Sequence, residues 1–122
     1  MGEIYVPLTV INPQTGAQSE PITALVDTGA TLAMLPGALL ESLGIRKART
    51  VTLALADGRR VVRAVGDAVI SLASDATSCR VVFGLDEDAA VLGLTALELL
   101  GLVVDPVDQR LVPKDYLLYS LV

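Results

Sequence analysis

The stretch Ala24-Leu-Val-Asp-Thr-Gly-Ala-Thr31 decides how the rest of this sequence is interpreted. Three apolar residues lead into Asp27, and a glycine follows two positions later. An apolar run that ends in Asp-Thr-Gly is typical of a strand that closes in a tight turn. Because Gly29 has no Cβ, the backbone can turn there and approach a neighbouring segment closely. The sequence therefore predicts an aspartate held in a loop at the end of a strand.

The chain on both sides of this loop has the pattern of short strands and turns. Strands are predicted where β-branched residues run between turn residues, at Ile4–Ile11, Ala17–Val26, Arg49–Leu55, Arg60–Leu72, Cys79–Phe83, Leu102–Asp105 and Arg110–Pro113. The turns Asn12–Gly16, Ala56–Arg59 and Pro106–Gln109 predict three hairpins, and the Asp-Gly in the second is the strongest signal. Gly66 marks an expected bend in the longest strand. We expect a mainly β architecture.

Two short helices interrupt the strands. The first, Ala38–Leu43, follows a proline that can start it and precedes Gly44, which can stop it. The second begins with a capping-box pattern, in which Thr95 and Glu98 would satisfy the first free amides. Gly101 ends this second helix.

Length, composition and charge limit the class of protein. A chain of 122 residues with 52% hydrophobic residues can bury one core, so residues 1–122 are expected to form a single domain. The formal charge of −5 argues against binding to nucleic acid, because phosphates would be repelled. The chain starts without basic residues or an apolar leader, and Thr95 and Glu98 interrupt its longest apolar stretch. We therefore expect a soluble, cytoplasmic protein without membrane contact.

The absence of histidine and the single cysteine exclude several kinds of catalytic site. The usual serine or cysteine triads and zinc sites of histidine or cysteine cannot be built. Acid and base chemistry is left to carboxylates, or to a lysine or tyrosine with a shifted pKa. Cys79 lies in an apolar, strand-like run and is expected to be a small buried hydrophobe. The acidic loop Leu85–Asp88 lacks the spacing of a calcium site and is expected to be solvated, and the sequence does not imply a metal or other cofactor.

The order of these motifs resembles that of the retropepsin-like aspartic peptidases. Members of that family have an apolar strand with Asp-Thr-Gly-Ala, then a hairpin, and then two apolar residues and a glycine before a helix. The corresponding residues here are Leu25–Ala30 and Val91-Leu92-Gly93, and the resemblance runs from about Val6 to Val112. Asp-Thr-Gly alone would be an ordinary Asx turn, so the flanking motifs carry the resemblance. It implies an all-β closed barrel with short helices and one domain per chain.

The resemblance also implies an aspartic endopeptidase whose catalytic residue is Asp27. Peptide hydrolysis by this route needs two carboxylates, one ionised to take a proton from water and one protonated to polarise the carbonyl. The chain contains a single Asp-Thr-Gly, so the second carboxylate must come from another copy in a symmetric homodimer. The residues implied to support the active-site loop are Thr28, Gly29 and Ala30. The residues implied to form a flap over a peptide or protein substrate are Ala56, Asp57, Gly58 and Arg59.

Two departures from viral members of the family are visible. Thr31 and Leu94 stand where viral enzymes usually have an acid and an arginine that pair with each other. Because both partners are replaced, no charge is left unpaired, and the sequence looks more like the cellular and bacterial branches of the family than the viral one. The flap tip also carries Asp57, Arg59 and Arg60 instead of being rich in glycine.

Two other functions are compatible with the sequence, and one feature concerns assembly. The charged flap tip also suits a catalytically inactive module of the same fold that binds peptides or dimerises. A structural β-barrel with a chance motif is the other alternative. In the dimer that the resemblance implies, Met1–Val6 and Tyr116–Val122 would interleave into an intersubunit sheet, which would also cover the apolar C-terminal segment.

Overall fold

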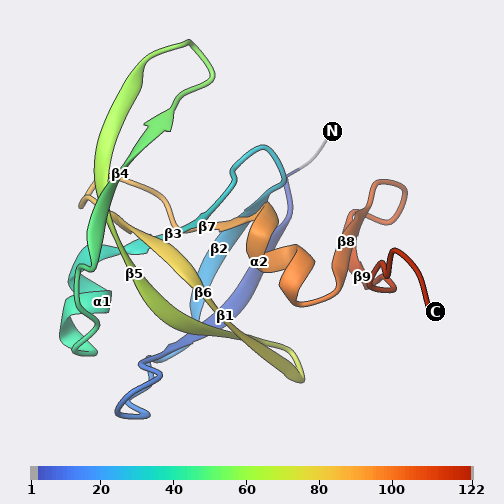
Figure 1. Ribbon diagram of the computed structural model, residues 1–122, viewed down its shortest axis with the longest axis horizontal. Helices are drawn as coiled ribbons and strands as arrows, with labels where there is room; N and C mark the ends of the chain where they lie inside the picture. Colours follow the sequence, from blue (N-terminus) through green and yellow to red (C-terminus); the bar gives the residue numbers. More distant parts are fainter. Residues whose placement is uncertain (1–2, 122) are drawn as a thin grey trace.

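The computed structural model describes residues 3–121, which form mostly short strands (Figure 1). The strands in this part of the chain are β1 Tyr5–Ile11, β2 Ile22–Asp27, β3 Ala33–Pro36, β4 Arg49–Ala54, β5 Arg60–Leu72, β6 Asp75–Gly84, β7 Val91–Gly93, β8 Leu102–Asp105 and β9 Arg110–Pro113. The helices are α1 Gly37–Ser42 and α2 Leu94–Leu99. The expected mainly β architecture with short helices is confirmed. None of the described helices has the length and apolar character needed to cross a membrane.

The main sheet closes on itself. Seven strands lie in the order β1-β2-β7-β3-β6-β5-β4, and β1 also pairs with β5. These pairings make a ring of β1, β2, β7, β3, β6 and β5, so the expected closed barrel is a ring-like sheet rather than a regular barrel. The hairpin of β8 and β9 forms a separate small sheet beside α2 (Figure 1).

Strand β4 lies outside the ring and forms a projecting hairpin. Its hydrogen-bonded neighbour in the described chain is β5, in antiparallel register from Arg49 opposite Val65 to Ala54 opposite Arg60. We call this paired segment, residues 49–65, the arm. In Figure 1 the arm rises away from the ring and ends in the turn predicted from Asp-Gly.

Two strand predictions were wrong in extent. Strand β2 begins at Ile22 rather than Ala17, and the segment before it makes only an isolated bridge from Gln18 to Ile11. Pro21 has no N–H to donate, which explains why regular pairing starts after it. Strand β6 is longer than predicted and pairs with β5 as far as Asp75 opposite Leu72.

The start of α2 also differs from the prediction. The N-cap residue is Gly93 and has no side-chain hydrogen bond, so the predicted capping box of Thr95 and Glu98 is wrong. Backbone carbonyls cap the helix instead: the N–H of Leu94 donates to the carbonyl of Ala30 at 2.7 Å, and the N–H of Thr95 to that of Thr31 at 3.0 Å. The loop after Asp27 therefore provides the cap.

The predicted proline start of α1 and the predicted glycine stops of both helices are confirmed. Pro36 is the N-cap of α1, and Gly44 and Gly101 follow the helices with φ of 78° and 66°. Such positive φ values favour glycine, which lacks the Cβ that would clash. The helices pack against the core inside the ring, whose largest fully buried side chains include Leu8, Leu35, Leu40, Ile70, Leu92 and Leu97.

Gly66 is required where the arm joins the ring. Strand β5 passes through it without interruption and continues its pairing with β6, opposite Val81. A Cβ at Gly66 would collide with the carbonyl oxygen of Arg46 and would lie 3.0 Å from a ring carbon of Phe83. We expect Gly66→Ala to lower the free energy of unfolding by about 2–3 kcal/mol, as measured by urea denaturation.

Gly58→Ala is the control for this prediction. Nothing lies within 4 Å of a Cβ at Gly58, where only the φ of 89° disfavours alanine. A loss of about 1 kcal/mol is expected there from backbone strain alone. Equal losses for the two variants would contradict the steric role of Gly66.

Candidate active site

Asp27 lies at the end of β2, directly beside the second glycine motif. Strands β2 and β7 pair in parallel, with Leu25 opposite Val91 and Asp27 opposite Gly93. Both strands are short apolar runs that lead into a turn, Ala24-Leu-Val and Ala90-Val-Leu. The structure thus brings together the two motifs that the sequence separates.

The loop after Asp27 holds the carboxylate from its own backbone. The N–H of Gly29 donates to Oδ1 of Asp27 at 2.9 Å, and the N–H of Ala30 donates to the Asp27 carbonyl at 3.2 Å. A Cβ at Gly29 would lie 3.2 Å from the same Oδ1, so a larger residue would crowd this oxygen. The carboxylate is oriented and yet exposed to solvent.

Gly93 leaves room for the other side of the loop. A Cβ at this position would lie 2.6 Å from the carbonyl carbon and oxygen of Leu32 and 2.9 Å from the carbonyl oxygen of Ala30. These are backbone atoms, which cannot rotate away as a side chain can. Together with the two backbone bonds that cap α2, this contact makes the Asp27 loop and the second glycine motif one rigid unit.

Asp27 borders a cavity of about 510 Å³ between the ring and the arm. The lining residues are Asp27, Gly29, Ala30, Thr31, Leu32, Met34, Val51, Thr52, Leu53, Ala54, Leu55, Val82 and Val91. The side chains from β3, β6 and β7 are apolar, and β4 covers the opposite wall. Asp27 is the one ionisable residue among these lining residues. The arrangement suits an apolar peptide side chain held next to a carboxylate.

The predicted flap tip lies outside this cavity. The lining from the arm ends at Leu55, one residue before the tip Ala56–Arg59. The tip is a closed turn in which the Arg59 side chain donates from Nε to Oδ2 of Asp57 at 2.7 Å, and the N–H of Leu55 donates to the Arg59 carbonyl at 2.7 Å. In this structure the arm faces Asp27 with its strand β4 rather than with its tip.

A second cavity, of about 360 Å³, reaches Asp27 from the other side. Asp27 and Thr28 line it together with Val104, Pro106 and Gln109 from the hairpin of β8 and β9. The Thr28 side chain is exposed and makes no hydrogen bond within residues 3–121. The Asp-Thr pair is therefore open to contacts on this face.

Comparison with known proteins assigns a family. Residues 14–99 match the family described as "gag-polyprotein putative aspartyl protease". The chain belongs to this aspartyl protease family. No curated protein was found to match it. Among solved structures, the solution structure of Simian Foamy Virus (mac) protease is similar, with a TM-score of 0.54 and 18% identity over 77% of this chain and 91% of that chain. This likeness confirms the retropepsin-like fold.

The sequence did not predict most of the residues that line the cavities at Asp27. Met34 and Val82 line the cavity because β3 pairs in parallel with β6, where these two residues lie opposite each other. The alternation of apolar residues in each strand was the available signal, but it does not tell which strands become neighbours. Pro106 and Gln109 were missed for the same reason, since they were read only as turn residues.

Cys79 does not line either of the cavities at Asp27. Burial, together with the charge of Asp67, raises the pKa of its thiol to about 11. The stabilisation of the neutral thiol is present below the ordinary pKa and is lost as the pH rises through the folded value. At pH 8 we expect Cys79 to react with iodoacetamide about a hundredfold more slowly than a free thiol, because the thiolate is scarce. Equal rates in the native protein would contradict this prediction.

Proposed function

We propose that this chain is an aspartic endopeptidase that hydrolyses peptide bonds between two Asp27 carboxylates of a homodimer. One observation carries the proposal: a cavity of about 510 Å³ with an apolar lining has Asp27 as its one ionisable lining residue. The family match, which covers residues 14–99, supports a protease function. The proposed protease unit spans residues 1–122, including the segments on both sides of the family match.

Exposed apolar side chains in the C-terminal segment support a dimer interface there. Tyr116, Leu117, Leu118, Tyr119 and Leu121 have exposed fractions of 68–104%, which is costly for a segment that stays in water. In an isologous dimer the same segments of two copies can cover each other. Residues 1, 2 and 122 of the expected intersubunit sheet lie outside the described residues.

The proposed mechanism follows from a pair of adjacent carboxylates. Two like charges at hydrogen-bonding distance oppose each other, so the two Asp27 side chains would share one proton. The ionised member takes a proton from water, and the protonated member donates a hydrogen bond to the carbonyl oxygen of the bound peptide. The oxygen of this water bonds to the carbonyl carbon, and when the C–N bond of the resulting intermediate breaks, the proton taken from water passes to the leaving amine. The N–H of Gly29 holds Oδ1 of each aspartate in place during these steps.

The loop chemistry supports assignment to the cellular and bacterial branch of the retropepsin-like proteases. Thr31 and Leu94 have exposed side chains and do not form the ion pair expected of viral members. Backbone hydrogen bonds that need no particular side chain, from Leu94 to Ala30 and from Thr95 to Thr31, connect the same two segments. The connection between the loop and α2 is therefore kept without buried charge.

A cleavage assay tests the proposed function. The purified protein is incubated with a broad peptide library at several pH values between acid and neutral, with and without pepstatin. We expect cleavage that pepstatin inhibits. If the dimer cuts no member of the library in this pH range, the endopeptidase proposal is wrong.

A non-catalytic peptide-binding module is the second candidate. The observation that favours it is the tip of the arm, where Arg59 and Asp57 are paired with each other and lie outside the Asp27 cavity. Peptide capture that survives Asp27→Ala, with no turnover by the unmutated protein, would select this function.

A further inference from the structure

The basic residues of this acidic chain are concentrated in and next to the arm. Residues 46–63 hold six of the nine basic residues and one of the fourteen acidic residues. This segment therefore carries a formal charge of +5, and the rest of the chain carries −10. We call residues 46–63 the basic segment. Its basic residues are Arg46, Lys47, Arg49, Arg59, Arg60 and Arg63.

Strand pairing places two of these arginines on the cavity face of the arm. Directly opposite residues of an antiparallel pair share a face, as does every second residue along a strand. Val51 is opposite Arg63, and Arg49 precedes Val51 by two positions. Val51, Thr52, Leu53 and Ala54 of β4 all line the Asp27 cavity. Of these, Val51 and Leu53 are half-buried and Thr52 and Ala54 are exposed, so the face of Val51 and Leu53 is the inner face of the arm. Arg49 and Arg63 therefore flank the apolar part of the arm on its inner face.

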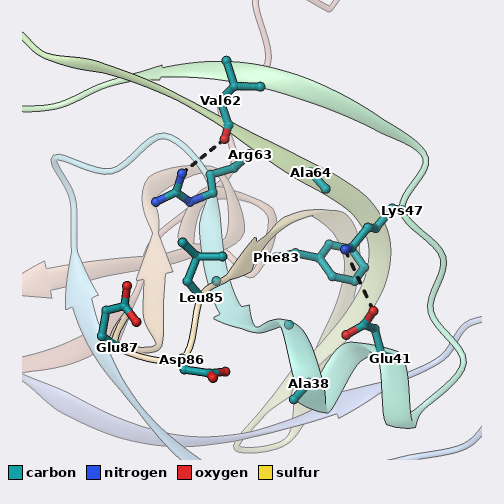
Figure 2. A pocket seen from close by; sticks show the side chains of 12 residues that line it. Ala38, Glu41, Lys47, Val62, Arg63, Ala64, Phe83, Leu85, Asp86 and Glu87 are labelled. Carbon is teal, nitrogen blue, oxygen red and sulfur yellow. Dashed lines mark hydrogen bonds and ion pairs between the residues drawn. The ribbon is translucent and has the colours of Figure 1, made fainter.

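Arg63 also reaches a third cavity, of about 540 Å³, beside the base of the arm (Figure 2). Its guanidinium donates from Nη1 to the Val62 carbonyl at 3.2 Å, and no carboxylate within residues 3–121 makes an ion pair with it. Asp86 and Glu87 also line this cavity. The guanidinium of Arg63 thus keeps donors available for a carboxylate from another molecule.

Lys47 is already engaged within the chain. Its Nζ lies 3.9 Å from Oε1 of Glu41 and 5.7 Å from the centroid of the Phe83 ring. Figure 2 shows this pair at the far end of the cavity from Arg63. Arg49 and Arg63 are therefore the better candidates for binding an external acid.

We propose that the preferred substrate is a peptide with an apolar residue at the cleavage site and an acidic residue two positions away, bound by Arg49 and Arg63. This inference rests on the proposed function. An extended peptide has the same two-residue period as β4, so a side chain two positions from the one that contacts Val51 meets Arg49. Guanidinium groups bind carboxylates through paired hydrogen bonds. Outside the basic segment the chain is strongly acidic and repels an acidic side chain of the substrate. We therefore expect this side chain to bind on the inner face of the arm.

Matched peptides test this inference. One apolar cleavage sequence is made with Glu, Gln or Lys two positions from the scissile bond, on either side, and kcat/KM is measured at low and high salt. We expect the Glu peptide to be cleaved about threefold to fivefold better than the Gln peptide, with the advantage shrinking at high salt. The Lys peptide should be the poorest substrate. A preference for Lys, or no preference between Glu and Gln, would overturn the inference and leave the endopeptidase function intact.

Variants locate the effect on the arm. Arg49→Gln and Arg63→Gln should each reduce the ratio of kcat/KM for the Glu peptide to kcat/KM for the Gln peptide. Arg80→Gln is the matched control, because Arg80 is an exposed arginine of β6 opposite Asp67 and lies outside the basic segment. Thermal melts show whether each variant is folded. An unchanged Glu advantage in folded Arg49→Gln and Arg63→Gln would contradict the assignment.

Binding separates the inference from turnover. The same three peptides, labelled with a fluorophore, are titrated into Asp27→Asn protein and followed by fluorescence anisotropy. Tighter binding of the Glu peptide than of the Gln peptide supports the inference even if the unmutated protein cleaves nothing, which would refute only the endopeptidase. Equal binding of the Glu and Gln peptides overturns the inference.

Discussion

Replacing Asp27 with asparagine should lower kcat/KM for peptide cleavage by about a thousandfold. An amide cannot take a proton from water, and general acid and base catalysis contributes roughly 10²- to 10⁴-fold to such reactions. The structural change is small, because asparagine has nearly the same shape and its side-chain oxygen can accept the bond from Gly29 at Oδ1. The far-ultraviolet circular dichroism spectrum and the oligomeric state should be unchanged. The loss is measured with a pepstatin-sensitive peptide.

Asp67→Asn is the matched control for this loss. Asp67 is an exposed aspartate of β5 and does not line the Asp27 cavity. Its replacement should leave kcat/KM within about twofold of that of the unmutated protein, since an exposed charge outside the cavity is screened by salt. If Asp27→Asn cleaves as well as the unmutated protein, Asp27 has no catalytic role.

Replacing Gly93 with alanine should cost both stability and activity. The new methyl group would overlap backbone atoms of Leu32 and Ala30, which lie within 2.6–2.9 Å of the Cβ position. To relieve the overlap, the loop after Asp27 must move, and the carboxylate moves with it. We expect the free energy of unfolding to fall by about 2–3 kcal/mol and kcat/KM to fall by at least about tenfold. Thermal denaturation and peptide cleavage measure the two losses.

Gly16→Ala provides the contrast. A Cβ at Gly16 meets nothing within 4 Å, and this turn lies outside the residues that line the cavities at Asp27. A positive φ of 79° should cost about 1 kcal/mol of stability and no activity. If Gly93→Ala behaves like Gly16→Ala, the rigid contact between the two motifs is not important for the site.

The sequence predicted those parts of the fold that depend on local chemistry. Proline and glycine bound α1 as expected, and Asp57-Gly58 closes the arm as expected. Each of these signals acts within a few residues, so no knowledge of distant neighbours is needed. The hairpin between β5 and β6 was missed because its turn contains Ala73, with a φ of 56°, and no glycine or asparagine.

The remaining features depend on contacts between distant segments. The predicted start of α2 was wrong because backbone carbonyls of Ala30 and Thr31 cap the helix. A capping pattern in the sequence shows only partners within the helix itself. The family resemblance identified the two motifs, and the parallel pairing of β2 and β7 is what places Asp27 opposite Gly93. A lone carboxylate at an open cavity also has no local signal for its partner, which symmetry would have to supply.

The distance between the two Asp27 side chains in the assembled protein tests the proposed mechanism most directly. A crystal structure of the dimer, supported by its mass in solution, gives this distance. We expect a dimer in which the nearest carboxylate oxygens lie about 3 Å apart, within hydrogen-bonding reach. A protein that stays monomeric at assay concentration, or a dimer that holds the two carboxylates far apart, would contradict it.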